Sequence, residues 1–255
     1  MNPTNALIDV RGLTKQYDEL LAANDLDFEV PSGTILGLVG PNGAGKTTSM
    51  RCMAGIIPPT SGRLLIGGYD LTVDPMHVKQ HIAFVPDTPH LFEYLTVEEH
   101  LRFAGRVHQL PDVEERMNKL LGEFELEEKR SHLPGALSRG MQQKAAICMA
   151  FLHDPKVIFL DEPLTGLDPL GIRRMKNSIV NRAREQGAAI IVSSHQLELI
   201  EEICDEIFVI KNGKKVISGT LEFIHSELEG LPEEPTLEDI FFHLTEYSEP
   251  AQDPR

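Results

Sequence analysis

The stretch ILGLVGPNGAGKTTSM, residues 35–50, decides the fold of this chain. Its first five residues are apolar and predict a buried strand, and its last residues predict the start of a helix. Between them, Gly40, Gly45, Lys46 and Thr47 match the spacing G-x-x-x-x-G-K-[ST], the phosphate-binding loop called Walker A. A strand, a glycine-rich loop and a helix in this order predict a nucleotide-binding α/β domain.

The residues of this loop suit a triphosphate for physical reasons. Glycine adopts backbone dihedrals that other residues avoid, and it lets the chain approach a ligand closely. We expect the N–H groups of residues 42–48 to converge on the β-phosphate, with the positive end of the helix aimed at the same anion. Lys46 would bridge the β- and γ-phosphates, and the Thr47 hydroxyl would ligate Mg²⁺. The predicted ATP-binding residues here are Gly40, Pro41, Asn42, Gly43, Ala44, Gly45, Lys46, Thr47 and Thr48.

The bulk composition limits the possible partners. A chain of 255 residues, 41% of them hydrophobic, suits one large domain or one domain with subdomains. The net charge of −15 argues against direct binding to nucleic acid or to an anionic lipid surface. We expect no direct membrane insertion and no secretory signal, because no long apolar run and no basic leader are present. The three widely spaced cysteines predict free thiols in a reducing cytoplasm.

Strand patterns dominate the first part of the chain. Residues 6–17 alternate well enough to be a strand with a turn at Gly12, and residues 20–30 predict a second strand. Residues 63–66 and 81–86 predict two further short strands. We therefore expect antiparallel strands beside one strand–loop–helix unit.

Helical patterns follow over residues 96–151. Thr96 and Glu99 form a capping box at the start of one helix, and residues 111–121 and 138–152 predict two more. The sequence therefore predicts a helical subdomain, about residues 88–155, inserted into the α/β core.

Alternating strands and helices resume after this segment. The unbroken apolar residues 157–161 and 188–194 predict buried strands, and residues 169–185 and 196–204 predict helices. The Asn-Gly pair at 212–213 predicts a hairpin with a type I′ turn. Such alternation implies a mostly parallel sheet with right-handed crossovers.

A second chemical motif lies at the end of the strand at 157–161. VIFLDEP places Asp161 and Glu162 at the carboxyl end of a buried parallel strand, where ligands of α/β sheets bind. Asp161 is placed to hold Mg²⁺, directly or through water, and Glu162 to polarise the attacking water as a general base. The phosphate loop alone does not name the reaction, since kinases, GTPases and motor ATPases share it.

Three further motifs make the family resemblance specific. LSRGMQQ, residues 137–143, resembles the signature motif LSGGQ of ATP-binding cassette (ABC) proteins, and LTGLDP, residues 164–169, resembles their D-loop. His195 stands where their switch histidine stands, and Tyr17 where an aromatic ring stacks on adenine, although Tyr17 also fits an ordinary strand aromatic. The resemblance covers about residues 6–225.

The resemblance implies a fold and an assembly. The fold is α/β: a P-loop NTPase (RecA-like) core with a mostly parallel sheet, an antiparallel β subdomain and an inserted α-helical subdomain. Two cassette chains would sandwich two ATPs head to tail, a homodimer in the simplest case. Ser138 and the N–H of Gly140 form a second anion site at a helix N-terminus, which would complete the ATP site of the partner copy. The expected catalytic residues are Glu162, His195 and Lys46.

Two positions depart from the family's pattern. Asp87 stands where the family has a glutamine that contacts Mg²⁺ and the lytic water, and Arg139 replaces a signature glycine. An anionic Asp87 would ligate Mg²⁺ more strongly but adds charge beside Asp161 and Glu162. The Arg139 side chain is expected to point outward, or to reach ATP or a partner loop. The expected metal ligands are Thr47, Asp87 and Asp161.

The leading functional hypothesis is the ATPase subunit of a membrane transporter, with ATP and Mg²⁺ as cofactors. Residues 1–228 would form the cassette, docked by residues 87–101 on a separate integral-membrane permease at the cytoplasmic face of the cell membrane. The acidic tail, 229–255, carries one helix pattern at 237–244 that favours export, and its last residues, 248–255, predict disorder. Two alternatives remain: a soluble cassette ATPase outside transport, and a regulatory ATP-binding subunit with weak hydrolysis.

Overall fold

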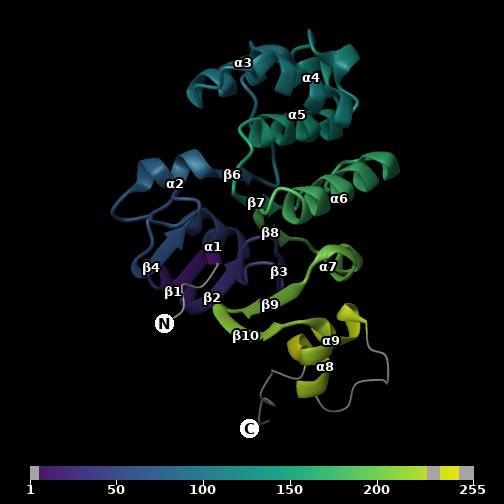
Figure 1. The fold of residues 1–255 in the computed structure, drawn as a ribbon. Helices are drawn as coiled ribbons and strands as arrows, with labels where there is room; N and C mark the ends of the chain where they lie inside the picture. Colours follow the sequence, from purple (N-terminus) through teal and green to yellow (C-terminus); the bar gives the residue numbers. More distant parts are fainter. Residues whose placement is uncertain (1–5, 229–235, 247–255) are drawn as a thin grey trace.

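The computed structural model describes residues 6–228 and 236–246 of the chain. Most of the acidic tail, residues 229–235 and 247–255, lies outside the described residues, and with it the disorder predicted for 248–255. Two sheets form the lower body of the molecule in Figure 1, and three helices gather above them. Among the helices of the described ranges, none is long and apolar enough to cross a membrane.

A six-stranded sheet forms the core and holds the phosphate loop. Its strand order is β10-β9-β3-β8-β7-β6, parallel throughout except for the antiparallel pair β9 and β10. β3, β7 and β8 are buried along their whole length, as their unbroken apolar runs predict for a sheet covered on both faces. The strand bounds are β3 Ile35–Val39, β6 Ile82–Val85, β7 Val157–Asp161, β8 Ala189–Ser193, β9 Glu206–Lys211 and β10 Lys214–Gly219.

A four-stranded antiparallel sheet, in the order β2-β1-β4-β5, packs beside the core. Its strands are β1 Ala6–Tyr17, β2 Leu20–Pro31, β4 Ser61–Ile66 and β5 Tyr69–Asp70. The turn predicted at Gly12 is wrong: β1 runs on through it, and Gly12, at a φ of 63°, sits at a register shift against β2. Helix α1, Lys46–Met53, packs against β1, β2 and β7 and so joins the two sheets.

Three helices form the group that we call the helical lobe: α3 Val97–Val107, α4 Val113–Glu123 and α5 Arg139–Phe151. The predicted capping box starts α3, where Glu99 N–H donates to the Thr96 hydroxyl and Thr96 N–H to the Glu99 carboxylate. Two short 3₁₀ turns, Glu127–Lys129 and Pro134–Ala136, connect α4 to α5.

The remaining helices flank the core sheet. They are α2 Pro75–His81, α6 Pro169–Arg184, α7 Leu197–Ile203, α8 Leu221–Glu227 and α9 Leu237–Glu246. α6 and α7 lie where helices are predicted, and so does α9, which packs against α7. α2 and α8 are not among the predicted elements. At the hairpin, Asn212 and Gly213 both have positive φ, as the predicted type I′ turn requires.

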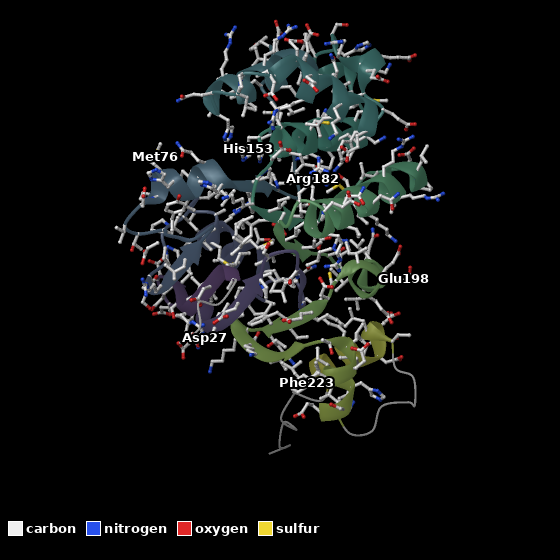
Figure 2. All side chains as sticks on the ribbon, viewed as in Figure 1. Asp27, Met76, His153, Arg182, Glu198 and Phe223 are labelled. Atoms are coloured by element: carbon white, nitrogen blue, oxygen red, sulfur yellow. The ribbon has the colours of Figure 1, made fainter. Side chains whose placement is uncertain are left out.

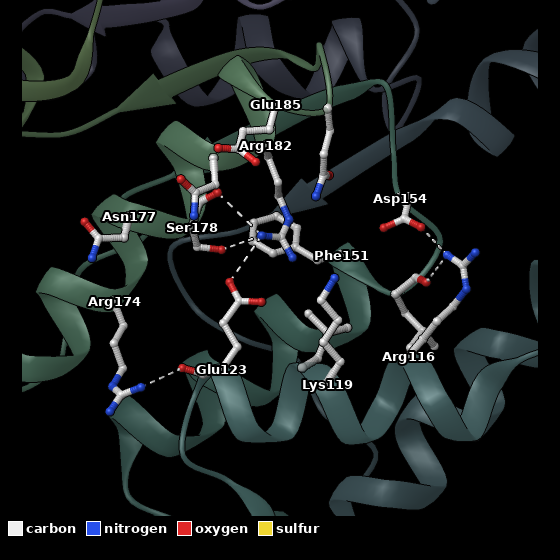
Figure 3. A pocket seen from close by; sticks show the side chains of 14 residues that line it. Arg116, Lys119, Glu123, Phe151, Asp154, Arg174, Asn177, Ser178, Arg182 and Glu185 are labelled. Atoms are coloured by element: carbon white, nitrogen blue, oxygen red, sulfur yellow. Dashed lines mark hydrogen bonds and ion pairs between the residues drawn. The ribbon is translucent and has the colours of Figure 1, made fainter.

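Side chains from the helical lobe meet those of α6 around Arg182 (Figure 2). Here α4 and the end of α5 face α6 across a cavity of about 670 Å³, the α4–α6 cavity (Figure 3). The guanidinium of the buried Arg182 lies 4.0 Å from the Phe151 ring centroid and donates to Ser178 Oγ at 2.6 Å and to Glu123 at 3.2 Å. Arg174 donates to the Glu123 carbonyl. These contacts tie the helical lobe to the core.

Candidate nucleotide-binding site

The phosphate loop packs closely against β9 and β2 at Gly40 and Gly45, whereas Gly43 faces open space. A Cβ at Gly40 would collide with the Ile210 carbonyl oxygen of β9, and one at Gly45 with the Ala22 carbonyl oxygen of β2. Gly43 has a φ of 78° and nothing within 4 Å of where a Cβ would lie. The close approach therefore requires glycine at 40 and 45, whereas at 43 the backbone conformation favours it.

Helix α1 begins at this loop without a capping side chain. Gly45, at a φ of 108°, occupies the N-cap position, and no side chain accepts from the first N–H groups of α1 among the described residues. Such unsatisfied N–H groups carry partial positive charge. The loop and the helix start therefore suit an anion.

A cavity of about 560 Å³, the nucleotide cavity, opens above the loop. Of the residues predicted from the sequence, it is lined by Tyr17, Asn42, Gly43, Ala44, Gly45, Lys46, Thr47, Thr48, Asp87, Asp161, Glu162 and His195. Gly40 and Pro41 do not line it; they contribute their carbonyls, to which Lys46 Nζ donates at 2.6 and 3.2 Å. The fold thus brings both chemical motifs and Asp87 around one cavity.

Lys46 is the cation of this cavity that the sequence predicts to grip phosphate. Burial lowers its pKa, while the carboxylates of Glu162 and Asp161 act in the opposite direction. Its partners in the structure are neutral backbone carbonyls, which are weaker acceptors for an ammonium group than phosphate oxygens. The ammonium can therefore exchange these partners for a triphosphate.

The two acidic residues after β7 occupy different environments. Asp161 is 3% exposed and accepts from Ser193 Oγ of β8 at 2.5 Å. Glu162 adopts a left-handed backbone, with a φ of 50°, while its N–H donates to the Ser193 carbonyl. This conformation, unusual away from glycine, turns the Glu162 side chain toward His195, whose Nδ1 lies 2.7 Å from Glu162 Oε1. The pair places a carboxylate and an imidazole together at the cavity.

The metal expected with a nucleotide is Mg²⁺, which favours oxygen ligands and keeps several waters or phosphate oxygens. The Thr47 hydroxyl and the carboxylates of Asp87 and Asp161 line the same cavity. Hydroxyl and carboxylate oxygens beside a phosphate loop are the donor set that Mg²⁺ uses with nucleotides. The residues present therefore fit a Mg²⁺–nucleotide complex.

Tyr17, the last residue of β1, also lines the cavity. It is 43% exposed, and Lys15 Nζ lies 4.8 Å from its ring centroid. An exposed ring that lines a cavity can stack on a nucleobase.

Ser138 and Gly140 lie at the start of α5 and do not line the nucleotide cavity of their own chain. Ser138 Oγ accepts from Met141 N–H at 3.3 Å as the N-cap. A Cβ at Gly140 would collide with the Gly166 carbonyl oxygen, so the signature segment packs directly on the loop at 164–169. Ser138 is exposed and remains accessible to another molecule.

Sequence reasoning did not single out five lining residues: Leu20, Leu21, Ala22, Thr165 and Asn212. Three of them start β2, and their place at the cavity follows from contacts between distant segments. Asn24 N–H donates to the Gly213 carbonyl, and Gly213 N–H donates to the Ala44 carbonyl. The Asn-Gly pair signals the turn but gives no sign that the turn reaches the phosphate loop.

Comparison with known proteins shows which family the chain resembles. The family model "ABC transporter" matches residues 23–165. EcsA of Bacillus subtilis, an ABC-type transporter ATP-binding protein, is 34% identical over 94% of this chain and 97% of its own length. The SkfA peptide export ATP-binding protein SkfE of the same organism is 37% identical over 82% of this chain and 87% of its own length.

A solved structure, titled as the ATP-binding subunit of an ABC transporter, has a TM-score of 0.87 to this chain at 36% identity. The match covers 94% of this chain and 99% of that chain. Together with the family model, this likeness confirms the predicted P-loop NTPase fold. The chain therefore belongs to the ABC transporter family, as one of its ATP-binding, ATP-hydrolysing proteins.

Proposed function

We propose that this chain is the ATPase subunit of an exporter, that it works with Mg²⁺ as a dimer, and that it acts on a separate membrane permease. The observation that carries the proposal is the Glu162–His195 pair at the nucleotide cavity that also holds Lys46 and Asp161. These groups supply a cation for the phosphates, a carboxylate for a metal and a base for water within one cavity.

Each residue then has a role in hydrolysis. The loop N–H groups and Lys46 bind the triphosphate, and Mg²⁺, held by Thr47, Asp161 and Asp87, would neutralise charge that develops on the phosphates. Glu162 takes a proton from the attacking water. His195, whose Nδ1 lies 2.7 Å from Glu162 Oε1, would orient that carboxylate.

A second copy of the chain completes the site. Ser138 is exposed and lies outside the cavity of its own chain, so it is free to face the nucleotide of another copy. ATP held between two chains would act as part of the interface, and hydrolysis would weaken it. This arrangement is a two-state switch controlled by the γ-phosphate.

The permease would dock on the surface between the helical lobe and the core, at the cytoplasmic face of the membrane. Phe103 and Val107 are exposed there, at a hollow between α3, α5 and β6, and the exposed Phe92 ring lies 5.6 Å from that of Phe103. Tyr94, two residues after Phe92, is 87% exposed. Exposed apolar groups gathered on one surface are typical of a protein interface. The name of the relative SkfE, a peptide export protein, favours export for this chain.

The test is the variant Glu162→Gln, which keeps the size of the side chain but removes the base. We expect steady-state ATP turnover with Mg²⁺ to fall by about 100-fold or more, while ATP binding persists and a dimer accumulates in size-exclusion chromatography. The control, Glu198→Gln, makes the same change on α7 and leaves turnover unaltered. Full turnover of Glu162→Gln would contradict the assigned base. A wild-type protein that binds ATP without turnover would favour the regulatory alternative.

Co-purification tests the transport part of the proposal. Pull-down of the tagged chain from solubilised membranes is expected to recover a multi-span membrane protein. Substituting Tyr94 and Phe92 with Ser should reduce that recovery without changing ATP turnover of the isolated chain. Recovery that does not depend on these two residues would place the docking surface elsewhere.

A further inference from the structure

The two positions that depart from the family's pattern meet in the fold. Asp87 follows β6 and lines the nucleotide cavity, whereas Arg139 is the first residue of α5, next to the signature serine. Arg139 Nη2 lies 3.7 Å from Asp87 Oδ1, within ion-pair distance. Both side chains are about half exposed, at 57% and 51% respectively. The Arg139 side chain, which is expected to point outward or to reach ATP or a partner loop, therefore also has a partner in its own chain, Asp87.

The position of Arg139 is set by the packing of its neighbours. Gly140 lies directly on the Gly166 carbonyl, so no side chain fits there, and α5 is seated on the loop after β7. The Arg139 side chain crosses the same glycine, with its Cγ 3.3 Å from where a Cβ of Gly166 would lie. This packing fixes the backbone and the Cγ of Arg139, and so it sets the position from which the guanidinium reaches Asp87.

The charges around the cavity explain why such a contact matters. Asp87, Asp161 and Glu162 all line the nucleotide cavity, and a triphosphate would add more negative charge to it. A neutral glutamine at 87 would add none. When no metal ion is bound, an unpaired Asp87 carboxylate would repel the phosphates. This repulsion would be stronger at low ionic strength, because salt screens it less.

We propose that Arg139 is a positioning residue for Asp87: it holds Asp87 Oδ1 and neutralises this carboxylate while no metal ion is bound to it, so that the cavity accepts a triphosphate despite its third carboxylate. The inference rests on the proposed nucleotide site and extends it: it links the residue after β6 to the signature helix of the same chain. The two departures from the family's pattern compensate each other.

The test is a double-mutant cycle with size-conserving variants, Arg139→Gln and Asp87→Asn. ATP affinity is measured by titration in EDTA, so that the readout reports binding without metal or turnover. We expect Arg139→Gln to weaken ATP binding by about twofold to fivefold, the range that exposed ion pairs contribute. In the Asp87→Asn background the same change should have almost no effect.

Two further measurements separate charge from structure. Arg139→Lys should restore most of the affinity, and added KCl at about 0.5 M should remove most of the difference between Arg139→Gln and wild type. Equal weakening by Arg139→Gln in the wild-type and Asp87→Asn backgrounds, or a loss that salt does not reduce, would overturn the proposal. Failure of the nucleotide site itself gives a different result, namely unchanged ATP affinity in Lys46→Ala.

Discussion

The nucleotide cavity and the α4–α6 cavity are similar in size, about 560 and 670 Å³, but opposite in construction. In the α4–α6 cavity two arginines are paired with carboxylates, Arg182 with Glu123 and Arg116 with Asp154, and Arg174 donates to the Glu123 carbonyl. In the nucleotide cavity, Lys46 is bonded only to backbone carbonyls among the described residues, and the helix start has no capping side chain.

This difference separates a structural cavity from a binding one. A ligand that separates Arg182 from Glu123, the most buried pair of the α4–α6 cavity, would leave a partly buried charge without its partner, at a cost of a few kcal/mol. A triphosphate entering the nucleotide cavity replaces weak neutral partners of Lys46 with charged ones, which form hydrogen bonds about twice as strong. The larger of the two cavities is not the one that suits a ligand. What distinguishes them is whether their cations already have charged partners.

The largest expected effect comes from removing the cation of the nucleotide cavity. Lys46→Ala should weaken ATP binding by about 30-fold or more and abolish turnover, because truncating a charged hydrogen-bond partner of a bound anion costs about 2 kcal/mol or more. Isothermal titration with ATP and a phosphate-release assay measure the two effects. The matched control is Lys119→Ala, the same change in the α4–α6 cavity, which should leave both values near wild type. A comparable loss of ATP affinity and turnover in both variants would contradict the conclusion that only the nucleotide cavity binds ATP.

The next effect falls on stability. Arg182→Met should lower the free energy of unfolding in urea by about 2–3 kcal/mol, because Glu123 loses its partner and Ser178 its donor in a partly buried place. ATP affinity of the folded protein should stay within about twofold of wild type. The double variant Arg182→Met with Glu123→Leu should recover part of the loss, since no carboxylate then remains unpaired. A loss of ATP affinity without a loss of stability would mean that the α4–α6 cavity takes part in nucleotide binding.

The sequence predicts the nucleotide cavity far better than the α4–α6 cavity. The phosphate loop is a local motif of eight positions, and its strand, turn and helix lie where the pattern places them. Asp161 and Glu162 follow from the rule that sites lie at the carboxyl ends of parallel strands. By contrast, Arg182 and Glu123 are 59 residues apart, and no spacing rule relates them before the helices pack.

Local signals also explain the missed elements. Helices α2 and α8 have seven residues each, so a hydrophobic period is hard to recognise. Helix α7 is as short, but it follows the strand pattern at 188–194 in the alternation of strands and helices. Their caps are readable: Asp74 accepts from His77 N–H, and Thr220 accepts from Phe223 N–H. Attention to N-cap residues would have found both helices. The contact between Asp87 and Arg139 is beyond such rules, because each residue stands out as an exception but nothing in the sequence pairs them.

The smallest expected effect is a pH dependence at His153, which lines a separate hollow between β6, α3 and α5. The ring stacks on His108 with centroids 3.7 Å apart, and its Nε2–H donates to the Ile82 carbonyl at 3.0 Å. Its Nδ1 is buried with no hydrogen-bond partner among the described residues. Burial, with a smaller effect from His108, lowers the pKa of His153 to about 4, although the Ile82 carbonyl and Asp154 favour the charged form.

Because the folded pKa lies below the ordinary value of about 6.5, the unfolded chain takes up a proton in this range and the folded chain does not. Stability should therefore fall as the pH drops from about 6.5 toward about 4, on the order of 1–2 kcal/mol between pH 7 and pH 5 for this residue. His153→Gln keeps a donor for the Ile82 carbonyl but cannot titrate, so its urea unfolding free energy should fall less over the same pH change. An equal fall in both proteins would assign the pH dependence to groups other than His153.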